Sequence, residues 1–354
     1  MTVTDDCPAD LVRVDPAGPG LTRRRRGRGF SYHDETGAVI SDPAEVARLK
    51  ALVIPPAWQD VWISADPRGH IQAVGTDVAG RRQYRYHEDW RRARDALKHD
   101  RVLTLGERLA DVRAEVVARL GQRGLSRDRV LAAAVRMLDI GVFRAGGEQY
   151  APGDDDEDGT FGLATLRREH VALRRGAVVF SYPAKGGIPR ELALRDPLLL
   201  RVVGSLLHRR GGGEELLAYW AQREWYDVKT ADLNAAVKEL AGEQFTCKDL
   251  RTWNATVLAA VALAAGAAEK GVPGTERGRK RLVTAAVRQV SEHLGNTPTV
   301  ARSSYVDPRV LERFDGGETV LPTLQRLEGC AAGLPVDDAS RAALERAVVD
   351  LIRR

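Results

Sequence analysis

The chain has 354 residues, of which 44% are hydrophobic and 29% charged, a composition ordinary for a globular protein with a normal core. Its length indicates about two domains. Cys7, Cys247 and Cys330 lie far apart and lack CxxC spacing, which argues against a disulfide framework or a zinc site. The net charge of +5 favours an anionic partner such as nucleic acid, or is simply a basic surface.

Two features argue against a membrane protein. The longest apolar stretch, residues 257–268, is rich in alanine and too short to span a bilayer, so we expect a buried helix there. The N-terminus lacks the basic and apolar regions of a signal peptide. We therefore expect a cytoplasmic protein without membrane contact.

The first ninety residues carry short strand-like pieces separated by turn signals. Residues 23–28 read RRRRGR, which is either a solvated segment or a stretch that lies along a phosphate backbone. The turn sequences DETG (residues 34–37) and DPRG (residues 66–69) each lie between two such pieces, as in hairpins. This pattern predicts a small, mostly antiparallel sheet.

From about residue 90 the pattern becomes helical. Apolar residues recur at helical spacing over residues 107–120, and Ser126 is a plausible N-cap for the next helix. A strand-like interlude covers residues 163–182. Further helices are expected at about 195–209, 214–224, 229–242, 247–269, 275–294 and 337–353. The predicted fold class is α+β, with a β-rich N-terminal domain (1–95) and a larger, mainly helical domain (96–354).

Two segments of the helical half combine a cation with glycines. Arg144 follows an apolar helix and precedes Gly146 and Gly147, so it either complements a helix C-terminus or lies where another group approaches the backbone closely. Lys185 is expected at the tip of a hairpin, where a lysine is usually only solvated.

Two further segments lie at helix ends. Lys248 and Arg251, three residues apart near a helix N-terminus, call for either an acidic neighbour or a bound phosphate. Gly295 is expected to end a helix, and Asn296 or Thr297 to cap the next, which leads to Tyr305. A tyrosine there is most often packing.

Taken together, these segments resemble the type IB DNA topoisomerases, in particular the poxvirus-type and bacterial enzymes. The resemblance rests on the chain order of Arg, Lys, Arg, Asn and Tyr and on the strings FRxGxExY, FxxxxK, KDxRTW and LGNTPxVxRxSY. It extends over residues 161–171 and covers the chain from about residue 20. It implies relaxation of supercoiled DNA by transient cleavage of one strand.

The resemblance also implies a role for each residue. Tyr305 is the nucleophile that forms a 3′-phosphotyrosyl link, and Lys185 is the general acid for the 5′-hydroxyl. Arg144, Arg251 and Asn296 stabilise the charge that develops at phosphorus. Since the link conserves the phosphoester energy, neither ATP nor a metal or other cofactor is expected. The absence of a GxxxxGK[ST] loop agrees with this.

In the N-terminal domain, residues 81–87 alternate basic, amide and aromatic side chains, as on a strand with two unlike faces. The resemblance implies that this segment contacts DNA in the major groove, whereas the plain reading is a solvated edge strand. The expected DNA contacts are Arg81, Arg82, Gln83, Tyr84 and Tyr86, together with Lys248.

The expected partner is double-stranded DNA, held by a monomeric clamp in the bacterial nucleoid. The acidic run 154–158 is interpreted as a solvated loop rather than a cation site. Two alternatives stay open at this point. A tyrosine recombinase or integrase shares this catalytic chemistry, but usually has a histidine in the box around Arg251 and a helical N-terminal domain. A DNA-binding module with a dead active site is the other.

Overall fold

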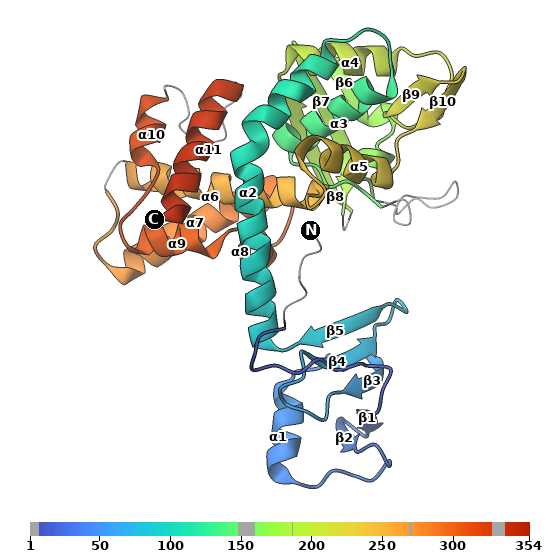
Figure 1. The fold of residues 1–354 in the computed structure, drawn as a ribbon, viewed down its shortest axis with the longest axis vertical. Helices are drawn as coiled ribbons and strands as arrows, with labels where there is room; N and C mark the ends of the chain where they lie inside the picture. The colour runs from blue at the N-terminus through green and yellow to red at the C-terminus, as the bar shows by residue number, and fades with distance from the viewer. Residues whose placement is uncertain (1–6, 148–159, 186, 269–270, 328–336) are drawn as a thin grey trace. The chain divides into compact units, whose positions relative to one another are not determined.

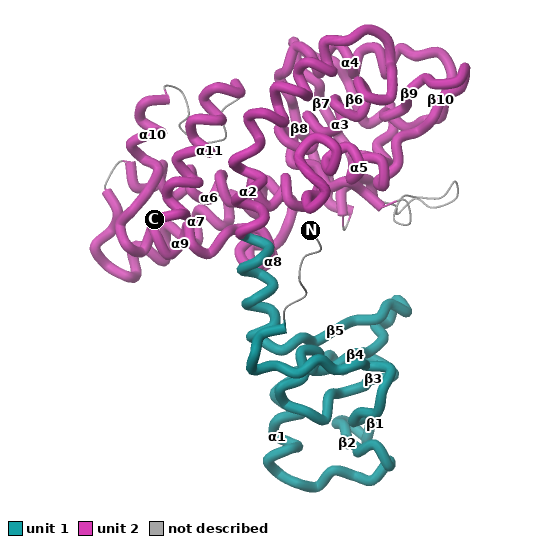
Figure 2. The backbone as a smooth tube through the Cα atoms, viewed as in Figure 1, with its two compact units in different colours: residues 1–99 teal, residues 100–354 magenta. Residues whose placement is uncertain are grey.

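The computed structural model describes residues 7–147, 160–185, 187–268, 271–327 and 337–354 (Figure 1). The chain forms two compact units, Met1–His99 and Asp100–Arg354 (Figure 2). The division falls inside the long helix α2 (Glu88–Leu120). The β-rich start and the mainly helical remainder match the predicted fold class.

The first unit is an antiparallel sheet in the order β2-β1-β3-β4-β5, packed on one helix. Its core includes Leu49 and Ile63, both fully buried. The hairpin predicted around DPRG is confirmed, since its two strands pair antiparallel. The elements of this unit are β1 (Leu21–Arg26), β2 (Gly29–His33), α1 (Pro43–Ala51), β3 (Gln59–Ile63), β4 (Ile71–Thr76) and β5 (Arg82–Tyr86).

Two details of this unit go beyond the sequence interpretation. The run RRRRGR forms most of strand β1 and a tight turn, in which Gly27 has a φ of 58°, and β1 pairs with β2. Helix α1 was not predicted, although Asp42 accepts hydrogen bonds from the first turn and Pro43 occupies its first position. An N-cap aspartate and a proline at the first position are both known helix start signals, but the helix has only nine residues and was therefore missed.

The second unit combines helices with a three-stranded sheet and a separate two-stranded one. The predicted helix start at Ser126 is confirmed, because its hydroxyl accepts from the backbone of Arg129. The helices of this unit beyond α2 are α3 (Arg127–Gly141), α4 (Pro197–Leu207), α5 (Thr230–Ala241), α6 (Cys247–Ala268), α7 (Glu276–Leu294), α8 (Pro298–Ser304), α9 (Pro308–Asp315), α10 (Leu321–Arg326) and α11 (Asp338–Arg353). The strands are β6 (Val171–Arg174), β7 (Ala177–Ala184), β8 (Ile188–Leu194), β9 (Ala218–Ala221) and β10 (Glu224–Asp227), and two short 3-10 turns are η2 (Leu163–Thr165) and η3 (Arg168–His170).

Helix α6 is the centre of the second unit. It contacts α3, α5, α7, α9, α10 and α11. By length and composition alone it could cross a membrane, but 83% of its most apolar window is buried inside the protein. The expectation of a buried helix at residues 257–268 is therefore confirmed.

The prediction of a helix at residues 214–224 is wrong. The chain there forms the hairpin β9–β10, in which Tyr219 stacks on Tyr226 at 5.6 Å between ring centroids. Gln222 and Arg223, the two residues of its turn, have φ values of 50° and 68°, the left-handed conformation that a tight hairpin needs. Cross-strand aromatic pairing outweighs the helical spacing of the leucines before it.

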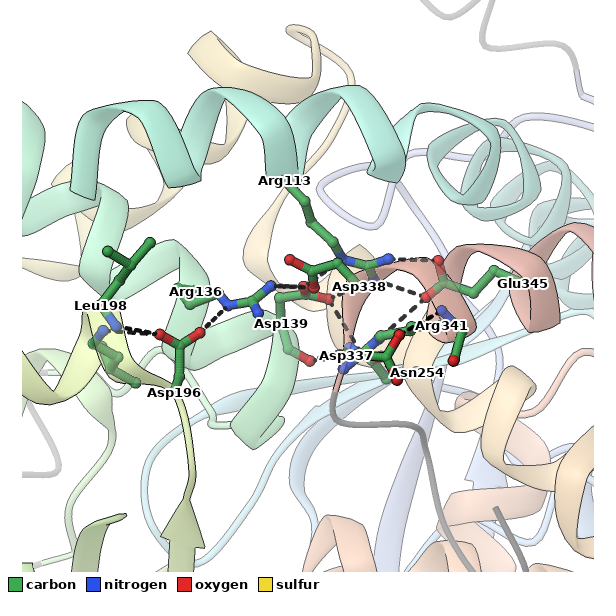
Figure 3. Close-up of polar contacts among 12 residues, drawn as sticks. Arg113, Arg136, Asp139, Asp196, Leu198, Asn254, Asp337, Asp338, Arg341 and Glu345 are labelled. Carbon is green, nitrogen blue, oxygen red and sulfur yellow. Dashed lines mark hydrogen bonds and ion pairs between the residues drawn. The ribbon is translucent and has the colours of Figure 1, made fainter. Parts of the chain in front are cut away.

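A buried network of charges fixes the end of α3 (Figure 3). Arg113 of α2 donates to Asp139 at 2.7 and 3.0 Å and to Glu345 of α11 at 2.7 Å. The main-chain carbonyl of Asp139 accepts from Asn254 of α6 at 2.9 Å and from Arg341 of α11 at 3.0 Å. Because all five are buried, each charge depends on its partners. The network therefore joins α2, α3, α6 and α11 just before the segment that carries Arg144.

Candidate active site

The structure brings four of the five predicted catalytic residues together. They come from separate places in the chain, at the ends of α3, α7 and α8 and in the first turns of α6. The four are Arg144, Arg251, Asn296 and Tyr305. Contacts that link residues more than forty positions apart hold them in place.

Arg251 is the most buried of the four, with only 3% of its surface exposed. Its guanidinium donates to the carbonyls of Val142, just after α3, and Leu294, at the end of α7. Its Cζ lies 5.5 Å from the centroid of the Tyr305 ring, and the phenol is close enough to act on the pKa of the guanidinium. The sequence left two explanations for a cation at this helix start, an acidic neighbour or a bound phosphate, and an acidic neighbour does not explain Arg251. In the described part of the chain it has no carboxylate partner.

Arg144 and Asn296 form a direct pair. The guanidinium of Arg144 donates to the side-chain oxygen of Asn296 and, at 3.0 Å, to the carbonyl of Gly295. Gly295 ends α7 with a φ of 59°, and Thr297 caps α8, as predicted. The backbone of Arg144 is fixed as well, because its carbonyl accepts from Leu163 at 2.9 Å.

Tyr305 ends the short helix α8 and is partly buried. Its amide donates to Ala301 at 3.1 Å, while its carbonyl accepts from the hydroxyl of Thr256 on α6 at 3.2 Å. The same hydroxyl accepts from the amide of Asp307 at 3.1 Å. Thr256 thus fastens the tyrosine segment to the central helix. No sequence signal marked it, because a threonine inside an apolar helix looks like core.

The four residues form a cationic site, and no described carboxylate forms an ion pair with either arginine. Burial lowers the pKa of Arg251 to about 10, and repulsion by Arg144 adds to this effect. Burial also lowers the pKa of Arg144. Two buried donors, Arg251 Nε and Asn296 Nδ2, have no hydrogen-bond partner among the described residues. Each such orphan costs about 1–3 kcal/mol, so the arrangement suits an anion that accepts from both.

The fifth predicted residue, Lys185, directly follows strand β7. The predicted hairpin is confirmed, since β7 and β8 pair from Val178 with Leu194 to Ala184 with Ile188. Lys185 is exposed at its tip, and no hydrogen bond or ion pair joins it to the other four in the described residues.

The predicted DNA contacts on β5 divide between its two faces. Tyr84 and Tyr86 are 43% and 41% exposed and stack on each other at 5.9 Å. Gln83 points to the other face and donates to Asp77 at 3.0 Å, and Arg81 also donates to Asp77 at 3.0 Å. β5 is an edge strand, so the tyrosine pair lies open beside unpaired backbone.

The two remaining predicted DNA contacts are both exposed. Arg82 lies on the same face of β5 as Tyr84 and Tyr86. Lys248 lies in the first turn of α6, where its solvent-facing side chain contrasts with the buried Arg251 one turn later.

Part of the sequence interpretation lies outside the described residues. This applies to Glu148 and Tyr150 of the string that begins at Phe143, and to the acidic run 154–158. Within the described ranges, no three His, Cys, Asp or Glu side chains are grouped as a metal site would need.

His293 lies beside the site and leads to a prediction about stability. Burial, with repulsion from Arg190 and Arg251, lowers its pKa from 6.5 to about 4, and its Nε2 has no partner in the described part of the chain. The folded protein thus holds this histidine neutral, and unfolding takes up a proton below pH 6.5. We expect the melting temperature to fall as the pH drops from 6.5 to 4.

Calorimetry on His293→Gln checks this. The variant should show a shallower fall in melting temperature over that range, while a variant at the exposed His208, His208→Gln, should keep the original slope. An unchanged slope in His293→Gln would contradict the prediction.

Comparison with known proteins agrees with this geometry. The chain matches the model of the eukaryotic DNA topoisomerase I catalytic core over residues 87–316, which include all five predicted catalytic residues. It matches the bacterial DNA topoisomerase IB N-terminal domain over residues 29–77. It is 27% identical over 300 residues to the DNA topoisomerase 1B of Acanthamoeba polyphaga mimivirus, covering 83% of this chain and 87% of the viral protein. It is 24% identical over 298 residues to the DNA topoisomerase 1B of vaccinia virus (strain Copenhagen), covering 81% and 87%. The chain therefore belongs to the type IB DNA topoisomerases.

Proposed function

We propose that this type IB topoisomerase relaxes supercoiled DNA by cleaving one strand with Tyr305 and resealing it, without ATP or a metal ion. The observation that carries the proposal is the convergence of Arg144, Arg251 and Asn296 on Tyr305, with two buried donors left unpartnered. A phosphodiester supplies two non-bridging oxygens, which match those donors. Duplex DNA as the substrate follows from the family.

The scissile phosphate binds where the two arginines and Asn296 meet. Charge grows on its oxygens as the phenol oxygen attacks, so fixed donors stabilise the transition state more than the bound substrate. Arg251 is suited to this because its position is set by two carbonyls and not by a carboxylate that would compete with the phosphate.

Lys185 is the general acid in this proposal. The Tyr305 oxygen loses its proton to water and bonds to phosphorus, the bond from phosphorus to the 5′-oxygen breaks, and the Lys185 ammonium gives that oxygen a proton. The exposed hairpin tip lets Lys185 reach the leaving group once DNA is bound. Religation reverses these steps, with the 5′-hydroxyl attacking the phosphotyrosine. No bond energy is lost, so no nucleotide has to be hydrolysed.

We propose that exposed residues of β5 and α6 contact DNA outside the site. Tyr84 and Tyr86, with Arg82 on the same face, present an exposed aromatic and basic strip at the sheet edge. Lys248 adds a cation one turn before Arg251. We propose that the N-terminal unit serves as a DNA clamp, that the protein acts as a monomer, and that it works in the bacterial nucleoid.

Plasmid relaxation in EDTA without ATP tests the function. We expect positively and negatively supercoiled plasmids to relax to the same topoisomer distribution, because strand rotation in the nicked complex follows the torque in either direction. A requirement for a divalent metal, for ATP, or for a pair of specific DNA sites would contradict the proposal. The last of these would indicate a recombinase.

A further inference from the structure

Arg190 is a third arginine at the site, and no sequence motif marked it. It lies on β8, five residues beyond Lys185, and directly faces Tyr182 of β7 across the hairpin. Facing residues of antiparallel strands point to the same side of a sheet. Tyr182 is buried with 5% of its surface exposed, so this side of the hairpin faces the protein interior.

The contacts of Arg190 lead to the end of α3. Its guanidinium donates to the carbonyl of Gly141 at 2.8 Å and to that of Val142 at 3.4 Å, and its Cζ lies 5.3 Å from the centroid of the Phe143 ring. Burial raises the pKa of the facing Tyr182 phenol, and the charge of Arg190 opposes this effect. A single side chain of β8 therefore connects the hairpin to the three residues before Arg144.

The Val142 carbonyl is a shared anchor point. It accepts from Arg190 of the hairpin and from Arg251 of α6. Carbonyls at a helix C-terminus lack partners within the helix and attract cations, which explains why two arginines converge on them. Val142 itself has a φ of 50°, so the chain turns sharply there and relies on these donors to hold the turn.

Arg190 has no carboxylate partner in the described residues, so its charge is not neutralised locally. Its fork spans the two carbonyls of Gly141 and Val142, a geometry that a lysine ammonium at this place would not reproduce. Phe143 also contacts Phe180 at 4.9 Å and Tyr182 at 6.1 Å between ring centroids, which packs the hairpin against the same turn. Such ring contacts still allow the hairpin to slide. The directional hydrogen bonds from Arg190 fix its position on the turn.

We propose that Arg190 is a positioning residue. It holds the Lys185 hairpin against the turn that precedes Arg144, so that Lys185 and the two arginines Arg144 and Arg251 act on the same phosphodiester. The proposal rests on the role of Lys185 proposed above. Arg190 itself does not touch the DNA.

The test compares two substrates in single-turnover cleavage, a normal duplex and one with a 5′-bridging phosphorothiolate, whose sulfur leaves without a proton. On the normal duplex we expect Arg190→Met to slow cleavage by about 100-fold, the scale of a misplaced catalytic group. Lys185→Ala should slow it by about 100- to 10,000-fold, the range of a lost general acid. On the phosphorothiolate both should come within about threefold of the unmodified protein, because the acid is no longer needed.

Two further variants make the test specific. Arg195→Met, at an exposed arginine just beyond β8, should cleave both substrates at the unmodified rate. Arg190→Lys keeps the charge but not the fork, so it should lose part of the rate, and it serves in place of Arg190→Met if that variant does not fold. Thermal unfolding and DNA affinity are measured for each variant.

The possible outcomes separate the two proposals. If the phosphorothiolate restores Lys185→Ala but not Arg190→Met, Lys185 remains the acid and the positioning role of Arg190 is overturned. An Arg190→Met protein that cleaves the normal duplex at the unmodified rate overturns it as well. If Lys185→Ala is not restored, the acid assignment itself fails, and the role of Arg190 falls with it.

Discussion

Replacing Tyr305 by phenylalanine is expected to abolish relaxation, with a loss of at least about 10⁴-fold, the scale seen when a catalytic nucleophile is removed. The phenylalanine ring keeps the packing beside Arg251, whose Cζ lies 5.5 Å from the tyrosine ring, but carries no oxygen to attack phosphorus. The main-chain bonds that hold this position, to Ala301 and from Thr256, do not involve the phenol. DNA affinity should therefore survive.

Relaxation time courses on agarose gels measure the first effect, and fluorescence anisotropy with a labelled duplex measures the second. The covalent protein–DNA adduct trapped by detergent should form with the unmodified protein and be missing from Tyr305→Phe. Tyr219→Phe, a tyrosine stacked in the β9–β10 hairpin, is a matched control that should relax plasmid normally. Relaxation by Tyr305→Phe, or its adduct with DNA, would rule out Tyr305 as the nucleophile.

Replacing Arg251 by alanine is expected to slow strand cleavage by about 10³- to 10⁵-fold, the range measured for arginines that neutralise a reacting phosphoryl group. The change removes a buried cation and a donor, Nε, that has no partner among the described residues. It also frees the carbonyls of Val142 and Leu294, which hold the ends of α3 and α7. The site should therefore lose one positive charge, and Arg144 and Asn296 should be held less firmly in position.

The measurement is single-turnover cleavage of a duplex whose cleaved strand dissociates, at a temperature where thermal unfolding shows the variant to be folded. Arg108→Ala is the control, because Arg108 also donates to a main-chain carbonyl, that of Ala241 at 2.9 Å, away from the site. Arg251→Lys should stay well below the unmodified rate, since an ammonium cannot bond both carbonyls and the phosphate. A folded Arg251→Ala protein that cleaves within about tenfold of the unmodified rate would contradict an electrostatic role of the size expected here.

Local signals in the sequence predicted the elements that carry the site. Ser126 and Thr297 begin helices and Gly295 ends one. In the strand before Lys185, buried and exposed side chains alternate, as expected in a hairpin. These features depend on a few neighbouring residues, whose hydrogen bonds and backbone conformation are decided within one turn. The same reasoning failed at residues 214–224, where pairing between two strands outweighed helical spacing.

The chain order of Arg144, Arg251, Asn296 and Tyr305, with the strings around them, was enough to name the chemistry. The structure added how they are held. Arg251 reaches Val142, and Arg144 reaches Gly295, across more than one hundred residues of chain. Contacts between residues so far apart in the chain cannot be predicted from the periodicity of the sequence or from short motifs.

The residues that support the site belong wholly to the tertiary structure. Thr256 looks like core until its hydroxyl meets the Tyr305 segment, and Arg190 looks like a solvated strand residue until β8 packs on the end of α3. The buried Arg113, Asp139 and Glu345 are single charges in the sequence that become tolerable only as a network (Figure 3). Sequence patterns thus specify the reacting groups, because their chemistry is intrinsic to the side chains. Packing specifies their alignment, because the cost of burying a charge or an unpaired carbonyl depends on partners that only the fold brings within reach.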